Sequence, residues 1–332
     1  MAKKIKDIDY LFISTYLRAR EKDMLTALGM DRMIEAPTAE DAAKVLQEIG
    51  YGEFSTANDS ELSAVLTRAR EEMFADLYRF VPDKAVVDVF KVKYDYHNLK
   101  AMLKASAMGL DGKRLMMDAG RVSAELMAEV VMEGSFDRLP GLLGSAARQA
   151  SDVLSATGDP QLSDFVLDRA YYAEMLSAAK ATGSKFLVEY VQVNIDSANL
   201  RSVVRTLRMK KGGEFLEKVL FEGGSVYRNN IIDAAFRGEV AEPFAASALR
   251  AAAEMGTDAV QGGSLTAFEK ACDDAVTAFA TKAKGVAFGV EAVIGYLVAK
   301  EIEFTAVRII MSSRMAGISG DTIRERLREA YV

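Results

Sequence analysis

Two six-residue segments combine an acid, an amide and a base in the order Asp-x-x-Asn-Leu-[Lys/Arg]. The first begins at Asp95 and the second at Asp196, 101 residues later. Acid and base are five positions apart, so on a helix they do not face each other and no intrahelical ion pair is expected. Two roles stay open for the polar side chains: hydrogen bonding to backbone ends within their own unit, which buried polar groups usually find, or lining a surface that meets another protein. The acids and amides concerned are Asp95, Asn98, Asp196 and Asn199.

Basic residues continue from each segment at helical spacing. Arg201, Arg205 and Arg208 share one helix face, and Lys100 with Lys104 repeats the beginning of that stripe. The stripe predicts either a solvated face opposite the core or a docking surface for acidic groups of a partner. Nucleic acid is not expected as that partner, because the chain has 42 basic against 48 acidic residues and no aromatic residues interleave with the stripe.

Few residues suit catalysis or metal binding. The chain has one histidine, His97, and one cysteine, Cys272, which excludes His-pair and cysteine-based metal sites. Adjacent carboxylates such as Asp273 and Asp274 diverge around a helix. No GxxxxGK[ST] segment is present, so nucleotide binding is not expected. We therefore predict no catalytic, cofactor-binding or metal-binding residues.

Apolar residues recur at steps of three and four, which is typical of helices. Only 5 prolines occur in 332 residues, and helix-start signals stand at Thr38, Asn58 and Asp159. We predict an all-α protein enclosed by an N-terminal helix (roughly 5–28) and a C-terminal helix (319–330). No segment resembles an export signal or is long and apolar enough to span a membrane.

Internal repeats organise the chain. A degenerate third copy of the segment runs from Glu303 to Arg308, displaced by 107 residues, with Ala306 in place of asparagine. Residues 127–134 also echo residues 216–223. We predict three related units: residues 1–110 with the N-terminal helix, residues 111–212, and residues 213–332 with the closing helix.

The longer pattern resembles the C subunit of bacterial and archaeal V/A-type ATP synthases, the relative of the d subunit in eukaryotic V-ATPases. The residues that carry the resemblance are an aromatic residue leading into each full segment, at Phe90 and Tyr190, and a third copy starting at Tyr296. The run from Tyr16 to Glu21, the turn at residues 50–52 and the stop at residues 222–224 fit the same layout. The resemblance covers essentially the whole chain.

The resemblance implies a funnel of three helical lobes with pseudo-threefold symmetry. It implies a non-catalytic rotor subunit at the cytoplasmic face of the membrane, held there by the c-ring (the ring of proteolipid subunits) and receiving the shaft made by the D and F subunits. Such a protein transmits the rotation that couples ATP hydrolysis or synthesis to proton or sodium transport. The partner-contact or lobe-structuring candidates are Asp95, Asn98, Lys100, Lys104, Asp196, Asn199, Arg201, Arg205, Arg208, Glu303 and Arg308.

One alternative is a helical-repeat adaptor unrelated to ATPases. Its repeats would be roughly 35–45 residues long, so the 101-residue spacing argues against it.

Overall fold

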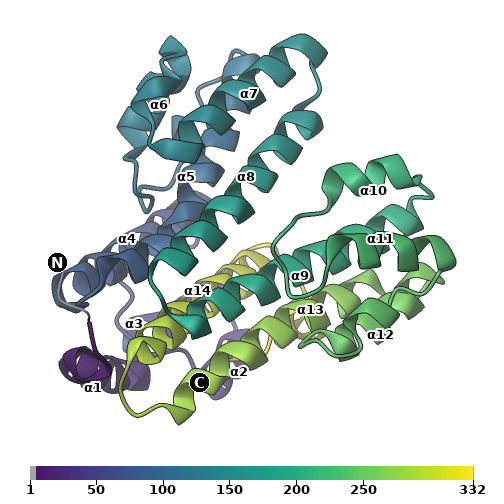
Figure 1. Ribbon diagram of the computed structural model, residues 1–332. Coiled ribbons are helices and arrows are strands. Elements are labelled where there is room, and N and C mark those ends of the chain that lie inside the picture. Colours follow the sequence, from purple (N-terminus) through teal and green to yellow (C-terminus); the bar gives the residue numbers. More distant parts are fainter. Residues whose placement is uncertain (1–4, 332) are drawn as a thin grey trace.

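Three long helical hairpins form the frame of the molecule (Figure 1). The computed structural model describes residues 5–331, and every regular element in that range is helical, which confirms the all-α prediction. The hairpins pair α4 (Asp59–Phe80) with α5 (Lys84–Ala107), α8 (Pro160–Ala181) with α9 (Lys185–Arg208), and α13 (Leu265–Ala280) with α14 (Val290–Met315).

Shorter helices fill the spaces between and beyond the hairpins. They are α1 (Leu11–Arg20), α2 (Ala27–Glu35), α3 (Ala39–Glu48), α6 (Ala124–Glu133), α7 (Gly141–Thr157), α10 (Gly213–Val219), α11 (Arg228–Arg237), α12 (Arg250–Val260) and α15 (Gly320–Arg326). Short 3₁₀ helices join them: η1 (Asp7–Tyr10), η2 (Glu21–Asp23), η3 (Lys113–Leu115), η4 (Phe136–Arg138), η5 (Glu242–Phe244) and η6 (Thr281–Gly285).

Side-chain caps begin the helices where the sequence predicts them. Thr38 accepts a hydrogen bond from the backbone of Asp41, Asn58 from the backbone of Glu61, and Asp159 from the backbone of Gln161. Each cap supplies an acceptor to a first-turn N–H group that has no partner within the helix. The start signals at Thr38, Asn58 and Asp159 are therefore confirmed.

The two terminal helices are shorter than predicted. The expected N-terminal helix over residues 5–28 is divided into η1, α1 and η2, and α2 then begins at Ala27. The division falls at Met24, whose extended backbone ends η2, and Thr26 caps the next helix. The expected C-terminal helix ends at Arg326, where Leu327 turns extended.

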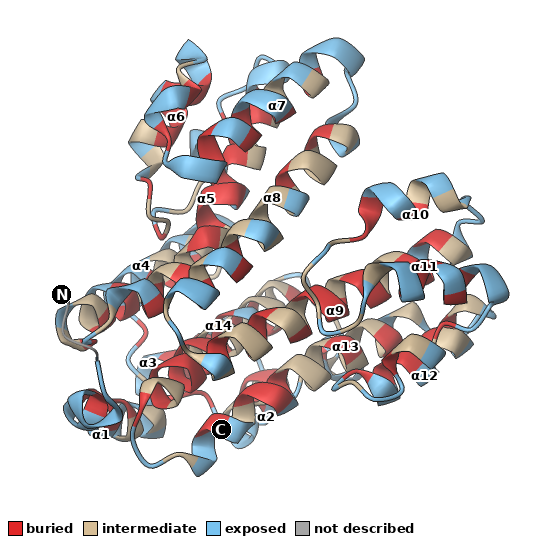
Figure 2. Ribbon diagram, in the orientation of Figure 1, coloured by how far each residue is buried: buried red, intermediate tan, exposed pale blue. Residues whose placement is uncertain are grey.

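The buried residues, red in Figure 2, belong to three clusters, and α5, α8, α9 and α13 each contribute to two of them. The first half of α5 joins a large cluster with α1–α4 and α14, whereas its second half packs with α6, α7 and the start of α8. Helix α9 divides in the same way, its second half packing with α10–α13. The boundaries at 110/111 and 212/213 stay predictions.

The three helices that carry the repeated segment end at equivalent positions. Helices α5, α9 and α14 end at Ala107, Arg208 and Met315, which reproduces the 101- and 107-residue displacements of the sequence repeat. In Figure 1, α5–α8 form one projecting lobe and α9–α13 another. The pseudo-threefold funnel stays a prediction.

Candidate functional site

The first repeated segment fastens a loop to α5. Asp95 is fully buried, and its Oδ1 accepts hydrogen bonds from the backbone of Arg121 at 2.8 Å and of Val122 at 3.0 Å. Asn98 exchanges two hydrogen bonds with the backbone of Met117, donating at 2.7 Å and accepting at 2.8 Å. The acid and the amide therefore hold the segment that leads into α6.

The second segment makes the same contacts on α9. The carboxylate of Asp196 accepts hydrogen bonds from the backbone of Ser225 at 3.0 Å and of Val226 at 3.2 Å, and from Ser225 Oγ at 2.5 Å. Asn199 exchanges hydrogen bonds of 2.9 and 2.8 Å with the backbone of Phe221. The bound loop leads into α11.

In the third copy, the acid binds a segment from the other end of the chain. Glu303 Oε2 accepts a hydrogen bond from the backbone of Leu25 at 2.9 Å, and Oε1 accepts one from the Tyr51 hydroxyl at 2.6 Å. Ala306 offers no amide for the second pair of hydrogen bonds. Helix α2 begins two residues after Leu25, just as α6 and α11 begin two residues after Val122 and Val226. These three short helices thus occupy equivalent places.

That equivalence corrects one of the predicted echoes. The sequence similarity between residues 127–134 and 216–223 equates α6 with α10. The loop held by Asp196 leads into α11 instead, and α10 lies before that loop. The two similar stretches therefore differ in structure: residues 127–134 lie at the end of α6, whereas residues 216–223 run from α10 into the loop.

Two glycines that the sequence reasoning missed make the acid contacts possible. A Cβ atom on Gly120 would overlap Oδ1 of Asp95, and one on Gly224 would overlap Oδ1 of Asp196. The third copy has Asp23 at the equivalent position, and the longer Glu303 side chain reaches the backbone from farther away. The sequence does carry a signal for these glycines. Each motif aspartate is followed downstream by a Gly-x-Val triplet, which begins at Gly120 in the first copy and at Gly224 in the second.

Burial dominates the electrostatics of the two aspartates. It raises the pKa of Asp95 and of Asp196 above the ordinary aspartate value, although the backbone donors favour the charged forms. Asp95 also contacts a cation, since Arg121 Nε donates to its Oδ2 at 2.6 Å.

The basic stripe binds acids inside the molecule. Lys100 and Lys104 of α5 pair with Asp168 and Asp164 of α8, the second pair at 2.6 Å. These contacts tie each segment-bearing helix to a helix of another hairpin. The remaining contacts are Arg201 with Asp273, Arg205 with Glu269 at 2.5 Å, Arg208 with the carbonyls of Ala259 and Gly263, and Arg308 with Ser63 at 3.1 Å and Asp59 at 3.7 Å.

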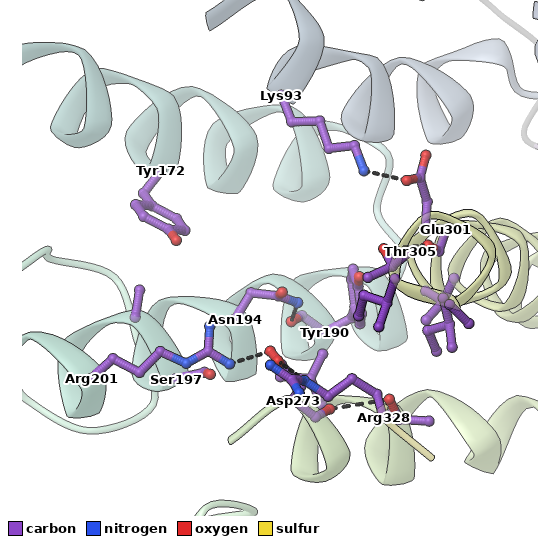
Figure 3. A pocket seen from close by; sticks show the side chains of 17 residues that line it. Lys93, Tyr172, Tyr190, Asn194, Ser197, Arg201, Asp273, Glu301, Thr305 and Arg328 are labelled. Atoms are coloured by element: carbon purple, nitrogen blue, oxygen red, sulfur yellow. Dashed lines mark hydrogen bonds and ion pairs between the residues drawn. The ribbon is translucent and has the colours of Figure 1, made fainter. Parts of the chain in front are cut away.

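A cavity of about 330 Å³, lined by both polar and apolar residues, lies where helices of all three hairpins meet (Figure 3). Its walls come from α5, α8, α9, α13 and α14 and from the segment after α15. The residues two positions before each motif acid, Lys93, Asn194 and Glu301, all line it. The sequence reasoning missed these three, which share one repeat position but differ in charge.

Two ion-pair groups face each other across the cavity (Figure 3). Lys93 Nζ lies 2.5 Å from Glu301 Oε2, and Arg70 lies 3.8 Å from the same carboxylate. Burial favours the neutral form of Glu301, but the neighbouring Lys93 and Arg70 outweigh it and lower its pKa. On the other side, Asp273 is bound by Arg201 and by Arg328 Nε, the latter at 2.5 Å.

Two polar atoms of the cavity wall have no hydrogen-bond partner among residues 5–331. They are the hydroxyl of Ser197 and Nε of Arg201, both on α9. Buried polar groups are nearly always bonded. Both atoms are buried, and the Arg201 guanidinium also lies beside the thiol of Cys272.

His97 and Cys272 do not form a catalytic pair. His97 is exposed, and its Nε2 lies 3.2 Å from the carbonyl of Leu115. Cys272 is buried, and burial raises the pKa of its thiol to about 11. No group of three potential metal ligands occurs within the described part of the chain.

These features define an all-helical scaffold built from repeated long helices around a cavity that several charged residues line. The chain belongs to the ATP synthase (C/AC39) subunit family, whose model matches residues 13–326. This membership sets aside the alternative of an adaptor unrelated to ATPases.

Curated relatives are similar over most of their length. The C subunit of the V-type sodium ATPase of Enterococcus hirae is 23% identical over 98% of this chain and 99% of its own. The C subunit of the A-type ATP synthase of Methanocaldococcus jannaschii is 24% identical over 96% of this chain and 86% of its own. The C subunit of the V-type ATP synthase of Thermus thermophilus is 23% identical over 64% of this chain and 70% of its own.

Family membership makes the chain a subunit of a membrane-associated rotary ATPase, with partners inside that complex. Between residues 5 and 331, no helix combines the length and the apolar character needed to cross a bilayer.

Proposed function

We propose that the chain is a non-catalytic rotor subunit that joins the c-ring in the membrane to the shaft of D and F subunits. It sits peripherally on the cytoplasmic face and transmits the rotation that couples ATP hydrolysis or synthesis to proton or sodium transport. It binds no nucleotide, nucleic acid, metal or cofactor of its own.

The convergence of Lys93, Asn194 and Glu301 on one cavity is the observation that carries this proposal. The three helices approach one another near these residues, well inside each helix, so they offer one central seat, while their C-terminal ends lie further away. From Lys93 to the end of α5 at Ala107 is about 21 Å at the rise of an α-helix. A single central binding site fits an asymmetric shaft, and helix ends that lie apart from one another fit a ring of repeated subunits.

Two outer ends carry matching apolar side chains. Met108 and Met209 directly follow α5 and α9, and both are exposed. Met132 and Phe236 are the ninth residues of α6 and α11, and both are exposed as well. Repeated apolar positions on two lobes suit a partner that presents the same surface several times, as a ring does.

Torque transmission requires stiffness, and the repeated segments supply it. We assign Asp95, Asn98, Asp196, Asn199 and Glu303 a lobe-structuring role, because each is buried or bonded to the backbone of its own lobe. The basic candidates share that role. They are Lys100, Lys104, Arg201, Arg205, Arg208 and Arg308, all bonded to side chains or backbone of a neighbouring helix.

Affinity purification of the tagged chain from detergent-solubilised membranes tests the proposal. We expect the proteolipids of the c-ring and the D and F subunits to co-purify in fixed ratio. A matched preparation carrying a tag on an unrelated cytosolic protein is the control. If the chain is recovered without the c-ring, or without the D and F subunits, the proposal is contradicted.

A further inference from the structure

We propose that the central cavity receives a carboxylate side chain from the shaft, bound on the α9 side by Arg201, Arg328 and Ser197. The proposal rests on the function proposed above and adds the chemistry of the contact. Three observations carry it: an excess of positive charge, two buried donors without acceptors among residues 5–331, and an apolar floor.

The charges that line the cavity do not balance. Three cations line it, Lys93, Arg201 and Arg328, against two anions, Glu301 and Asp273. Each anion is already bound by cations of the chain, Glu301 by Lys93 and Asp273 by both arginines. One positive charge remains for a ligand. Because the site is partly shielded from water, a single negative charge is the favoured complement.

The free donors lie beside that charge. The Ser197 side chain is buried at 2% exposure, and its hydroxyl has no hydrogen-bond partner within the described chain. Arg201 lies one helical turn further along α9, and its Nε has no hydrogen-bond partner there either. Figure 3 shows both side chains on the cavity side of α9, next to Asp273. An acceptor oxygen inserted beside Arg201 would bond the Ser197 hydroxyl, whereas the Arg201 guanidinium also lies against the buried thiol of Cys272.

The rest of the wall favours a side chain over a free ion. Val276, Ile302 and Ala306 contribute apolar surface to the same cavity. Methylene groups of an aspartate or glutamate can pack there, whereas a doubly charged phosphate would exceed the charge excess and leave this surface uncovered. A carboxylate carried on an inserted protein segment meets both requirements.

The charge pattern also fixes the orientation of the partner. The repeat-equivalent positions hold a cation in Lys93, a neutral amide in Asn194 and an anion in Glu301. Because Lys93 and Glu301 are paired with each other, the unbalanced positive charge lies on the α9 side of the cavity, at Arg201 and Arg328. The partner's carboxylate is therefore directed to that side.

Binding of purified D–F shaft to the full-length chain, measured by calorimetry, tests the inference. Asp273→Asn removes the internal competitor of both arginines, so we expect binding about three- to tenfold tighter. Arg328→Gln and Ser197→Ala remove ligand donors and should weaken binding by about three- to tenfold. Arg148→Gln is the matched control, since Arg148 pairs with Asp137 on the exposed surface of the lobe built on α5 and α8.

The outcomes separate the two proposals. A wild-type chain that does not bind the shaft overturns the proposed function. A wild-type chain that binds it with unchanged affinity in the Asp273, Arg328 and Ser197 variants, each shown to be folded by its thermal transition, overturns this inference alone. Saturable binding of acetate or inorganic phosphate without the shaft, lost in Arg328→Gln, would identify a free anion as the ligand and also overturn it.

Discussion

The carboxylate of Glu303 accepts a hydrogen bond from the backbone N–H of Leu25, 278 residues earlier in the chain. The same contact is made within about 30 residues in the other two copies, from Asp95 to Val122 and from Asp196 to Val226. This contact joins the beginning of the chain to its end, because Leu25 directly precedes α2 and Glu303 lies on α14.

Glu303→Ala should loosen the N-terminal elements selectively. It removes the acceptor of Leu25 and Tyr51 and leaves Lys300, which also contacts Glu303, without its acid. We expect a loss of about 3 kcal/mol in the free energy of unfolding. Hydrogen exchange should accelerate in α2 and α3 and stay unchanged in α6 and α11. Uniform acceleration across all lobes would contradict the assignment.

Replacing the motif amide Asn199 should lower the free energy of unfolding more than replacing Asn194 on the same helix. Asn199→Ala strands the N–H and the carbonyl of Phe221, each of which costs roughly 1–3 kcal/mol when buried, so we expect a loss of about 2–4 kcal/mol. Asn194→Ala on α9 is the control, because the Asn194 amide donates to the carbonyl of Tyr190 within its own helix. Equal losses in denaturant unfolding of the two variants would refute the loop-fastening role.

Gly224→Ala should destabilise the protein through a steric clash alone. The added Cβ would displace the Asp196 carboxylate from its backbone donors, and we expect a loss of about 2–4 kcal/mol. Gly212→Ala meets no described atom within 4 Å at a φ of −80° and serves as the control. Denaturant unfolding should show little change for the control, and similar stability of both variants would count against the close approach.

Two buried acids should give opposite pH dependences. Burial raises the pKa of Asp196, so the folded state retains its proton longer and the stability that this group contributes falls as pH rises from about 4. The destabilisation caused by Asp196→Asn should therefore be larger in acid than at pH 7. The pKa of Glu301 is lowered, so the destabilisation caused by Glu301→Gln should be full at pH 7 and shrink in acid.

Denaturant unfolding of both variants and the wild type between about pH 3.5 and 7 checks these signs. Differences from the wild type cancel the contributions of all other titrating groups. Parallel curves for the two variants would contradict the opposite pKa shifts of Asp196 and Glu301.

The sequence predicted the all-α class and the equivalence of Asp95 with Asp196, because helical periodicity and a repeated segment are local properties. It did not predict that Leu25 joins Glu303, since a contact between chain ends leaves no local pattern. The cavity was missed for a related reason. Lys93, Asn194 and Glu301 share a repeat position but no residue type, so only their convergence in space reveals them.

The basic stripe shows a further limit of sequence reasoning. Arg205 is exposed, as a solvated face requires, and it also pairs with Glu269 of α13. Spacing places residues on a helix face, but the partner of that face is set by tertiary packing. The acids that bind the stripe lie in α8 and α13, far along the chain.

ATP-driven ion transport by the reconstituted complex tests the central claim most directly. Vesicles that contain the ring, the shaft and the nucleotide-binding head are compared with and without this chain, while ATP hydrolysis is recorded in parallel. We predict that ATP hydrolysis continues without the chain but drives no ion transport. Adding the chain should restore ion transport. Equal transport in its absence would contradict the account.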